Sequence, residues 1–273
     1  VYNVWISERP IQLAAALAYY TIFAFAPIIY IAYMIAGFIL NEQMISANFS
    51  DNLAERLGPD LSAYIYSSVE RIQESTSSSS PVISIISIIA LLFAASGLFF
   101  QLQTALNTIW KVPPVERGAT GAFIRQRLFS FLMVIGVGLV LVVITLVSVL
   151  ISFLGSLLPI FSDYQIWSML AFVAIATLSF MLLYKILPNT VIAWRDVIPG
   201  ALLSAVLILV GGGILIWYLG SSRASSALQA AGTVAIFLVM FYYMAQIFLI
   251  GALFSRVYAH MFGSKKTFVE KKP

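Results

Sequence analysis

Residues 85–95, IISIIALLFAA, decide the fold, and residues 137–147, VGLVLVVITLV, have the same character. Neither stretch alternates apolar and polar residues as the strands of a membrane barrel do, and neither has a continuous polar face. A segment that is apolar on all sides predicts a helix surrounded by lipid or by other apolar helices, because a helix satisfies its backbone hydrogen bonds internally.

The composition extends this interpretation to the whole chain. Of 273 residues, 61% are hydrophobic and only 10% are charged, and the mean hydropathy is +0.99. A water-soluble domain carries about 25% charged residues, so this chain lacks the polar side chains to cover a soluble globule. The sequence contains no cysteine and one histidine. Disulfides and thiolate metal sites are therefore excluded, and we expect no metal and no other cofactor.

The number of spans follows from the distances between charged residues, because a transmembrane helix needs about 20 largely apolar residues. The long uncharged stretches run from Arg9 to Glu42, Glu74 to Lys111, Arg127 to Asp163, Asp163 to Lys185, Asp196 to Arg223 and Arg223 to Arg256. They predict an all-α polytopic membrane protein with one domain over residues 1–273. Its six transmembrane helices are expected at about residues 11–40, 82–106, 129–157, 165–187, 197–220 and 232–257. The opening residues, VYNVWISERP, lack the features of a signal peptide, so none is expected.

The cations indicate the orientation in the membrane. With six spans, all lysines and arginines except Arg56, Arg71 and Arg223 fall on one side. The positive-inside rule makes that side cytoplasmic, together with both termini and a basic tail at 263–273. The net charge of +4 is thereby explained by membrane orientation and by contact with anionic membrane lipids, and no nucleic-acid partner is required.

Residues 41–80 form the long external segment between the first two spans. Apolar residues recur there at helical spacing: Phe49, Leu53, Leu57, Leu61, Ile65, Val69 and Ile72. We expect amphipathic external helices. They either cap the bundle at the outer interface or provide a gate or a surface for a partner protein.

Polar residues inside the spans are candidates for a substrate pathway. Pro27 removes a backbone donor and predicts a broken first helix, with Tyr19 and Tyr20 one to two turns before the break. This region is either a tightly packed internal helix or a hydroxyl-lined cavity. The remaining pathway candidates are Gln101, Asn107, Tyr243 and Gln246. In lipid, such groups either bond neighbouring helices or line a wet pathway.

Two further groups have a structural and a functional interpretation. The consecutive glycines Gly211, Gly212 and Gly213 in the fifth span indicate either close helix packing or a hinge. The inner cations either orient the chain or bind an anionic lipid head group, since guanidinium and ammonium groups donate to phosphate oxygens. These cations are Arg117, Arg125, Arg127, Lys185 and Arg195.

Several motifs resemble the YihY/BrkB family of bacterial inner-membrane proteins over about residues 5–262. They are ALAYYT at 16–21 with Pro27, ALNTIWKV at 105–112, YKILP at 184–188, Trp194, and PGA at 199–201. The resemblance implies a six-helix protein of the bacterial inner membrane, sometimes labelled virulence factor BrkB and sometimes ribonuclease BN. The sequence departs from the family pattern at AGT, residues 231–233, where the family often has Tyr-Gly.

Two functional hypotheses follow, and neither is enzymatic. Metal-assisted hydrolysis of RNA needs clustered His and Asp ligands, so the single histidine argues against a ribonuclease. The first hypothesis is a transporter or flippase-like protein for an amphiphilic, lipid-type substrate that we expect to be anionic. The second is a membrane scaffold that docks a periplasmic envelope protein through residues 41–80.

Overall fold

The structure is a computed structural model that describes residues 10–39, 81–113, 164–220 and 233–265, together with single positions within 67–74 and 132–147. No residue in these ranges belongs to a strand, so the predicted all-α fold class is confirmed for the described part of the chain. Most of the external segment 41–80, most of the predicted span 129–157 and the tail beyond residue 265 lie outside the described residues.

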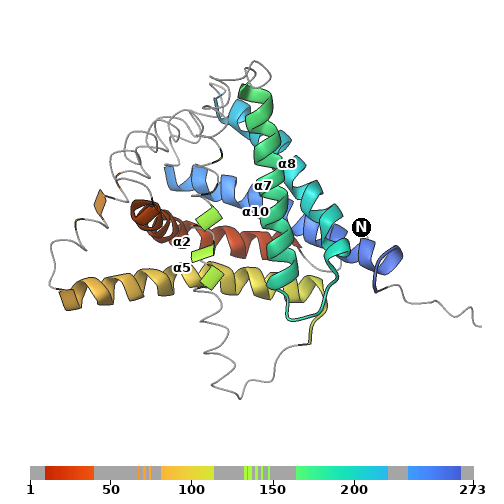
Figure 1. The fold of residues 1–273 in the computed structure, drawn as a ribbon, viewed down its shortest axis with the longest axis horizontal. Helices are drawn as coiled ribbons and strands as arrows, with labels where there is room; N and C mark the ends of the chain where they lie inside the picture. Colours follow the sequence, from red (N-terminus) through yellow and green to blue (C-terminus); the bar gives the residue numbers. More distant parts are fainter. Residues whose placement is uncertain are drawn as a thin grey trace, which may run out of the picture.

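The long helices of the described ranges are α2 (Pro10–Ile39), α5 (Pro81–Ile109), α7 (Tyr164–Ile186), α8 (Trp194–Gly220) and α10 (Thr233–Met261), as Figure 1 shows. Helices α2 and α5 both begin with proline, which is favoured at the first helical position because its missing N–H would have no partner there. Helix α8 has Asp196 in its first turn, where the helix dipole favours an acidic side chain.

The helices have the lengths that membrane spans require. Helix α7 contains 23 residues, which corresponds to about 35 Å at 1.5 Å per residue, and the hydrocarbon core of a bilayer is about 30 Å thick. By length and composition, four described helices, within α5, α7, α8 and α10, could cross a membrane, and a shorter apolar stretch covers Pro10–Phe25 of α2. The count of six spans stays a prediction.

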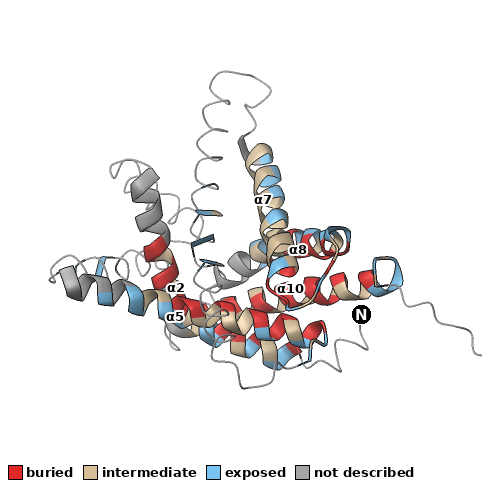
Figure 2. Ribbon diagram, turned by 60° about the horizontal axis from the view of Figure 1, so that its bottom comes forward, coloured by how far each residue is buried: buried red, intermediate tan, exposed pale blue. Residues whose placement is uncertain are grey.

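Helix α10 packs against both α8 and α2, while α2 also packs against α5, and α7 against α8. Figure 1 shows α2, α5 and α10 running side by side, with α7 crossing their direction steeply. In Figure 2 the buried residues gather where α2, α5, α8 and α10 meet, whereas α7 is mostly half-buried or exposed.

The outside of this bundle is apolar. Each long helix exposes large hydrophobic side chains, for example Phe23 of α2, Ile89 of α5, Leu170 of α7, Val210 of α8 and Leu238 of α10. Such a surface suits contact with lipid. Helices in lipid gain nothing by hiding apolar surface from it, so their association depends on close packing and on hydrogen bonds between helices.

Helices α8 and α10 pack closely at two glycines. A Cβ atom added to Gly200 of α8 would overlap the carbonyl oxygen of Gly251 and the hydroxyl of Ser255. A Cβ atom added to Gly251 of α10 would overlap the hydroxyl of Ser204 and would lie 2.7 Å from the carbonyl oxygen of Gly200. The two helices can therefore approach this closely only because both positions are glycine.

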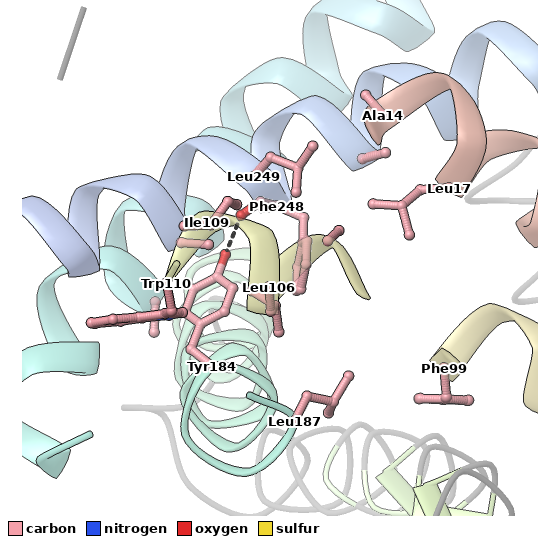
Figure 3. Close-up of a cluster of buried hydrophobic side chains, with 14 of the residues drawn as sticks. Ala14, Leu17, Phe99, Leu106, Ile109, Trp110, Tyr184, Leu187, Phe248 and Leu249 are labelled. Atoms are coloured by element: carbon pink, nitrogen blue, oxygen red, sulfur yellow. Dashed lines mark hydrogen bonds between the residues drawn. The ribbon is translucent and has the colours of Figure 1, made fainter. Parts of the chain in front are cut away.

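Tyr184 joins α7 to this contact. Its side chain is fully buried, and its hydroxyl lies 2.7 Å from the carbonyl oxygen of Phe248 and 2.8 Å from Ser204 Oγ, as the dashed line to Phe248 in Figure 3 illustrates. Ser204 Oγ also lies 3.3 Å from the carbonyl oxygen of Ile247. One tyrosine and one serine thus connect three helices through polar groups that are satisfied within the protein.

Helix α2 continues through Pro27, so the predicted break in the first helix is wrong. The residues on both sides of the proline are held by packing. Phe25 contacts Phe237 and Phe241 of α10, with ring centroids 5.5 and 5.1 Å apart, and Pro27, Ile28 and Ile31 are buried. These contacts keep α2 helical although Pro27 removes one backbone hydrogen bond.

The three consecutive glycines of α8 have different surroundings. A Cβ atom on Gly211 would overlap the hydroxyl of Tyr243 in α10, so this glycine permits close packing. A Cβ atom on Gly212 or Gly213 would meet nothing within 4 Å. Packing explains the first glycine, and a hinge at Gly212 and Gly213 stays a prediction.

We predict that Gly251→Ala lowers the free energy of unfolding by about 1–3 kcal/mol, because the added methyl group forces α8 and α10 apart. Gly212→Ala is the matched control. Its Cβ atom meets open space, so higher helix propensity should leave stability unchanged or raise it by up to about 1 kcal/mol. Unfolding of both variants in detergent, followed by circular dichroism, measures the difference. Equal destabilisation by the two substitutions would show that the close contact at Gly251 does not contribute to stability as predicted.

Candidate functional site: the polar junction

Polar side chains gather where the C-terminal ends of α5, α7 and α10 meet the N-terminal end of α8. We call this cluster the polar junction. It consists of Gln103, Asn107, Trp110, Lys185, Asn189, Thr190, Trp194, Asp196, Arg256, Ser264 and Lys265. The topology predicted from the uncharged stretches places all of these helix ends on the same side of the membrane.

Two amides of α5 hold the hairpin 187–193, which connects α7 to α8. Gln103 Nε2 donates to the carbonyl oxygen of Leu187 at 2.9 Å and to Asn189 Oδ1 at 3.2 Å. Asn107 Oδ1 accepts a hydrogen bond of 2.8 Å from the backbone N–H of Asn189. Asn107, a predicted pathway residue, is therefore engaged in fixing the hairpin to α5.

Lys185, in the last turn of α7, contacts the same hairpin. Its Nζ donates to the carbonyl oxygen of Ile192 and lies 5.6 Å from the ring centroid of Trp194. The side chain is half-buried. The neighbouring Arg195, another predicted head-group residue, is exposed. Arg117, Arg125 and Arg127, predicted for the same role, lie outside the described residues.

Lys265 approaches the hairpin from the chain that follows α10. Its Nζ lies 3.2 Å from Thr190 Oγ1 and 5.1 Å from the ring centroid of Trp110, a buried residue beyond the end of α5. The sequence predicted only a basic tail here. Nothing in the sequence pattern distinguishes Lys265 from Lys266, because the distinction depends on where the chain turns after α10.

Asp196 holds the beginning of this tail. Its side chain is 1% exposed, and its carboxylate accepts hydrogen bonds from the backbone N–H of Ser264, at 3.2 and 3.3 Å, and from the Ser264 hydroxyl at 2.5 Å. A Cβ atom on Gly263 would overlap the carboxylate, so glycine is required for this approach. These donors and the N-terminal end of α8 stabilise the buried negative charge.

Arg256 of α10 connects to the end of α5. Its Nη1 donates a hydrogen bond of 2.7 Å to the carbonyl oxygen of Ile109, which belongs to the last turn of α5. Carbonyl groups at this end of a helix have no intrahelical partner, so a cationic donor stabilises them. The junction therefore ties α5 to α10 as well as to the hairpin.

The other predicted pathway residues lie within the helices, away from the hairpin. Tyr20 of α2 contacts α5 at Gly97, where an added Cβ atom would lie 3.5 Å from the tyrosine ring. Tyr19 packs edge-on against both Tyr20 and Phe23, with centroids 5.8 and 5.0 Å apart. Gln101 lies one turn beyond Gly97 on the same face of α5.

The last two predicted pathway residues, Tyr243 and Gln246, lie on α10 in different surroundings. Tyr243 packs on Gly211 of α8, and Gln246 is half-buried. Pro27 is buried within α2. Within the described ranges, no group of three or more His, Cys, Asp and Glu residues could hold a metal ion.

The chain is similar to known membrane proteins over nearly its whole length. A family model described as virulence factor BrkB matches residues 2–272. The UPF0761 membrane protein of Glaesserella parasuis is 28% identical over 218 residues, which are 77% of this chain and 71% of that protein. The UPF0761 membrane protein of Stenotrophomonas maltophilia strain K279a is 27% identical over 242 residues, or 86% of this chain and 53% of that protein.

A third relative, the UPF0761 membrane protein of Alcanivorax borkumensis, is 23% identical over 250 residues, which are 88% of this chain and 55% of that protein. This chain therefore spans little more than half the length of the Stenotrophomonas and Alcanivorax relatives. No solved structure matches the chain. The relatives and the apolar helices together indicate a multi-pass membrane protein.

We predict that Asn107→Ala increases amide hydrogen exchange in the hairpin 187–193 about two- to tenfold. The substitution removes the acceptor of the Asn189 N–H, and a hydrogen bond of this kind contributes about 0.5–1.5 kcal/mol. Thr108→Ala is the control, because the exposed Thr108 hydroxyl bonds only to the Thr104 carbonyl oxygen of its own helix. Unchanged exchange in both variants would mean that Asn107 does not hold the hairpin.

Proposed function

We propose a function from the premise that this chain belongs to the virulence factor BrkB family of membrane proteins. In this proposal, the chain moves an amphiphilic, anionic lipid-type substrate across the bacterial inner membrane. The family names state no substrate and no reaction, so the proposal depends on the distribution of polar groups in the helices.

The observation that carries the proposal is a set of polar side chains within apolar helices that have no hydrogen-bond partner among the described residues. Tyr19 and Tyr20 are 58% and 40% exposed, and neither hydroxyl bonds to another described residue. The half-buried amides of Gln101 and Gln246 also make no hydrogen bond within the described part of the chain. An unsatisfied polar group costs about 1–3 kcal/mol, so these side chains favour a site that is wet or that receives a polar ligand.

The position of Tyr20 and Gln101 suggests a route. Tyr20 lies on Gly97, and Gln101 follows one turn later toward the polar junction. The junction and its rim carry Lys185, Lys265 and the exposed Arg195. We infer that a head group enters at this basic rim, passes Gln101 and reaches Tyr20 while its acyl chains remain in lipid.

The orientation of this route follows the positive-inside rule. The basic rim faces the cytoplasm in the proposal, with Arg117, Arg125 and Arg127 on the same side. A hinge at Gly212 and Gly213 would allow one end of α8 to move, since side-chain packing does not restrain these two positions. The proposed activity is physical movement of the lipid and includes no covalent step.

A second candidate function is the scaffold, which binds a periplasmic envelope protein through residues 41–80. One observation favours it. The described positions of this segment, Ser67, Glu70, Arg71 and Glu74, are helical, and the last three are exposed. Their spacing places them on one helix face, which therefore presents polar groups outward as an amphipathic external helix would.

A lipid-movement assay tests the first proposal. We predict that the purified chain in proteoliposomes moves fluorescent phosphatidylglycerol between leaflets and that Gln101→Leu slows this movement about tenfold. A tenfold change corresponds to the loss of about one interaction of 1.4 kcal/mol at the barrier. Thr104→Val, on the same helix, is the control because its exposed hydroxyl bonds only to the Phe100 carbonyl oxygen.

Two outcomes reject the transport proposal. One is a wild-type chain that moves no lipid above protein-free vesicles, and the other is equal slowing by Gln101→Leu and Thr104→Val. If the wild-type chain moves no lipid and deletion of residues 50–72 abolishes copurification of an envelope protein, the scaffold is the better description.

A further inference from the structure

Two lysines from distant parts of the sequence bind the same short stretch of the hairpin. Lys185 Nζ donates to the carbonyl oxygen of Ile192, and Lys265 Nζ lies 3.2 Å from Thr190 Oγ1. Each ammonium also lies beside an indole ring, at 5.6 Å from the centroid of Trp194 for Lys185 and at 5.1 Å from that of Trp110 for Lys265. The two lysine–indole pairs therefore contact the hairpin two residues apart, at Thr190 and Ile192.

The positive charges of these lysines are not neutralised by a carboxylate in the described part of the chain. Both side chains are half-buried, and their hydrogen-bond acceptors are neutral oxygens. The carboxylate of the junction, Asp196, instead accepts hydrogen bonds from Ser264. Each ammonium carries three N–H donors, of which the hairpin uses one. A partly buried cation without a counter-charge has lost part of its hydration, and a bound anion compensates for that loss.

Trp110 adds a donor that has no partner among the described residues. Its side chain is 7% exposed, and its Nε1 is buried without a hydrogen bond in the described structure. The face of the same indole lies beside Lys265. A bound oxyanion would stabilise both groups. Its negative charge would neutralise Lys265, and its oxygens would accept a hydrogen bond from the buried Trp110 Nε1.

We propose that Lys185, Lys265, Trp110 and Trp194 around residues 190–192 form a binding site for a phosphate group. Phosphate suits the site because its several oxygens can accept hydrogen bonds from the ammonium groups of Lys185 and Lys265 and from the Thr190 hydroxyl. Tryptophan and lysine are also the residues found at the level of lipid head groups. The role of the site as the entry point for a phospholipid rests on the proposed function, whereas phosphate binding itself is measured separately.

The source of the phosphate group is either a lipid head group or free phosphate, and the experiment distinguishes them. The purified chain in detergent is titrated with inorganic phosphate, with dihexanoyl phosphatidic acid, and with dihexanoyl phosphatidylcholine at constant ionic strength. Tryptophan fluorescence reports binding, because Trp110 and Trp194 lie beside the two lysines. Response to inorganic phosphate and phosphatidic acid supports a general phosphate site, and response to phosphatidic acid alone supports a lipid head-group site.

Matched double variants test the lysines. We expect Lys185→Gln with Lys265→Gln to weaken phosphatidic acid binding about tenfold or more, since a charge-assisted hydrogen bond is lost at each position. Lys271→Gln with Lys272→Gln removes the same charge from the end of the tail and should change the affinity less than about twofold. Lys185→Arg with Lys265→Arg keeps both charges, tests whether the site tolerates substitution, and should remain within about fivefold of the wild-type chain.

The proposal is overturned if no phosphate compound binds, if phosphatidylcholine binds as well as phosphatidic acid, or if the two glutamine double variants lose equal affinity. Single Lys265→Gln keeps the test decisive if the double variant does not fold, because within the described part of the chain Lys265 Nζ donates only to the Thr190 hydroxyl. Lipid movement is measured on the same proteins. Binding without wild-type lipid movement contradicts only the transport proposal, and undiminished movement without binding contradicts only the phosphate site.

Discussion

The close approach of α8 and α10 at Gly200 and Gly251 is the contact on which the arrangement of the other described helices depends. It brings Ser204 and the carbonyl oxygen of Phe248 within reach of the buried Tyr184, which attaches α7. It also places the first turn of α8 beside the end of α10, where Asp196 meets Ser264. Because lipid provides no hydrophobic force that gathers helices, small residues and internal hydrogen bonds have to do so, and this contact combines both.

The amide side chains of α5 have different structural roles, which depend on their positions along the helix. Gln103 and Asn107 hold the hairpin between α7 and α8. Gln101, on a different face of the same helix, makes no hydrogen bond within the described residues and lies one turn from the contact between Tyr20 and Gly97. The first two amides stabilise the structure, whereas the amide of Gln101 has no such role within the described residues.

The electrostatics of the polar junction follow from the same division. Asp196 accepts hydrogen bonds from Ser264 and lies at the N-terminal end of α8, and among the described residues its carboxylate accepts no hydrogen bond from Lys185 or Lys265. Lys185 and Lys265 have neutral acceptors and indole faces as partners. A cation–π contact contributes about 0.5–2 kcal/mol but supplies no negative charge. Hydrogen bonds therefore hold the polar junction together, but its two lysines have no anionic partner among the described residues.

The sequence by itself determined the helical membrane class and the family, because spanning a bilayer requires length and hydrophobicity that each segment shows locally. It also identified the polar residues and the cations as candidates. Only the tertiary structure decided that α2 continues through Pro27, that Gly211 packs on Tyr243 and that Lys265 reaches Thr190. These outcomes depend on groups far apart in the chain, such as Gln103 and Leu187, which are 84 residues apart, and Arg256 and Ile109, which are 147 apart. Local patterns contain no information about such approaches, since the packing of neighbouring helices determines them.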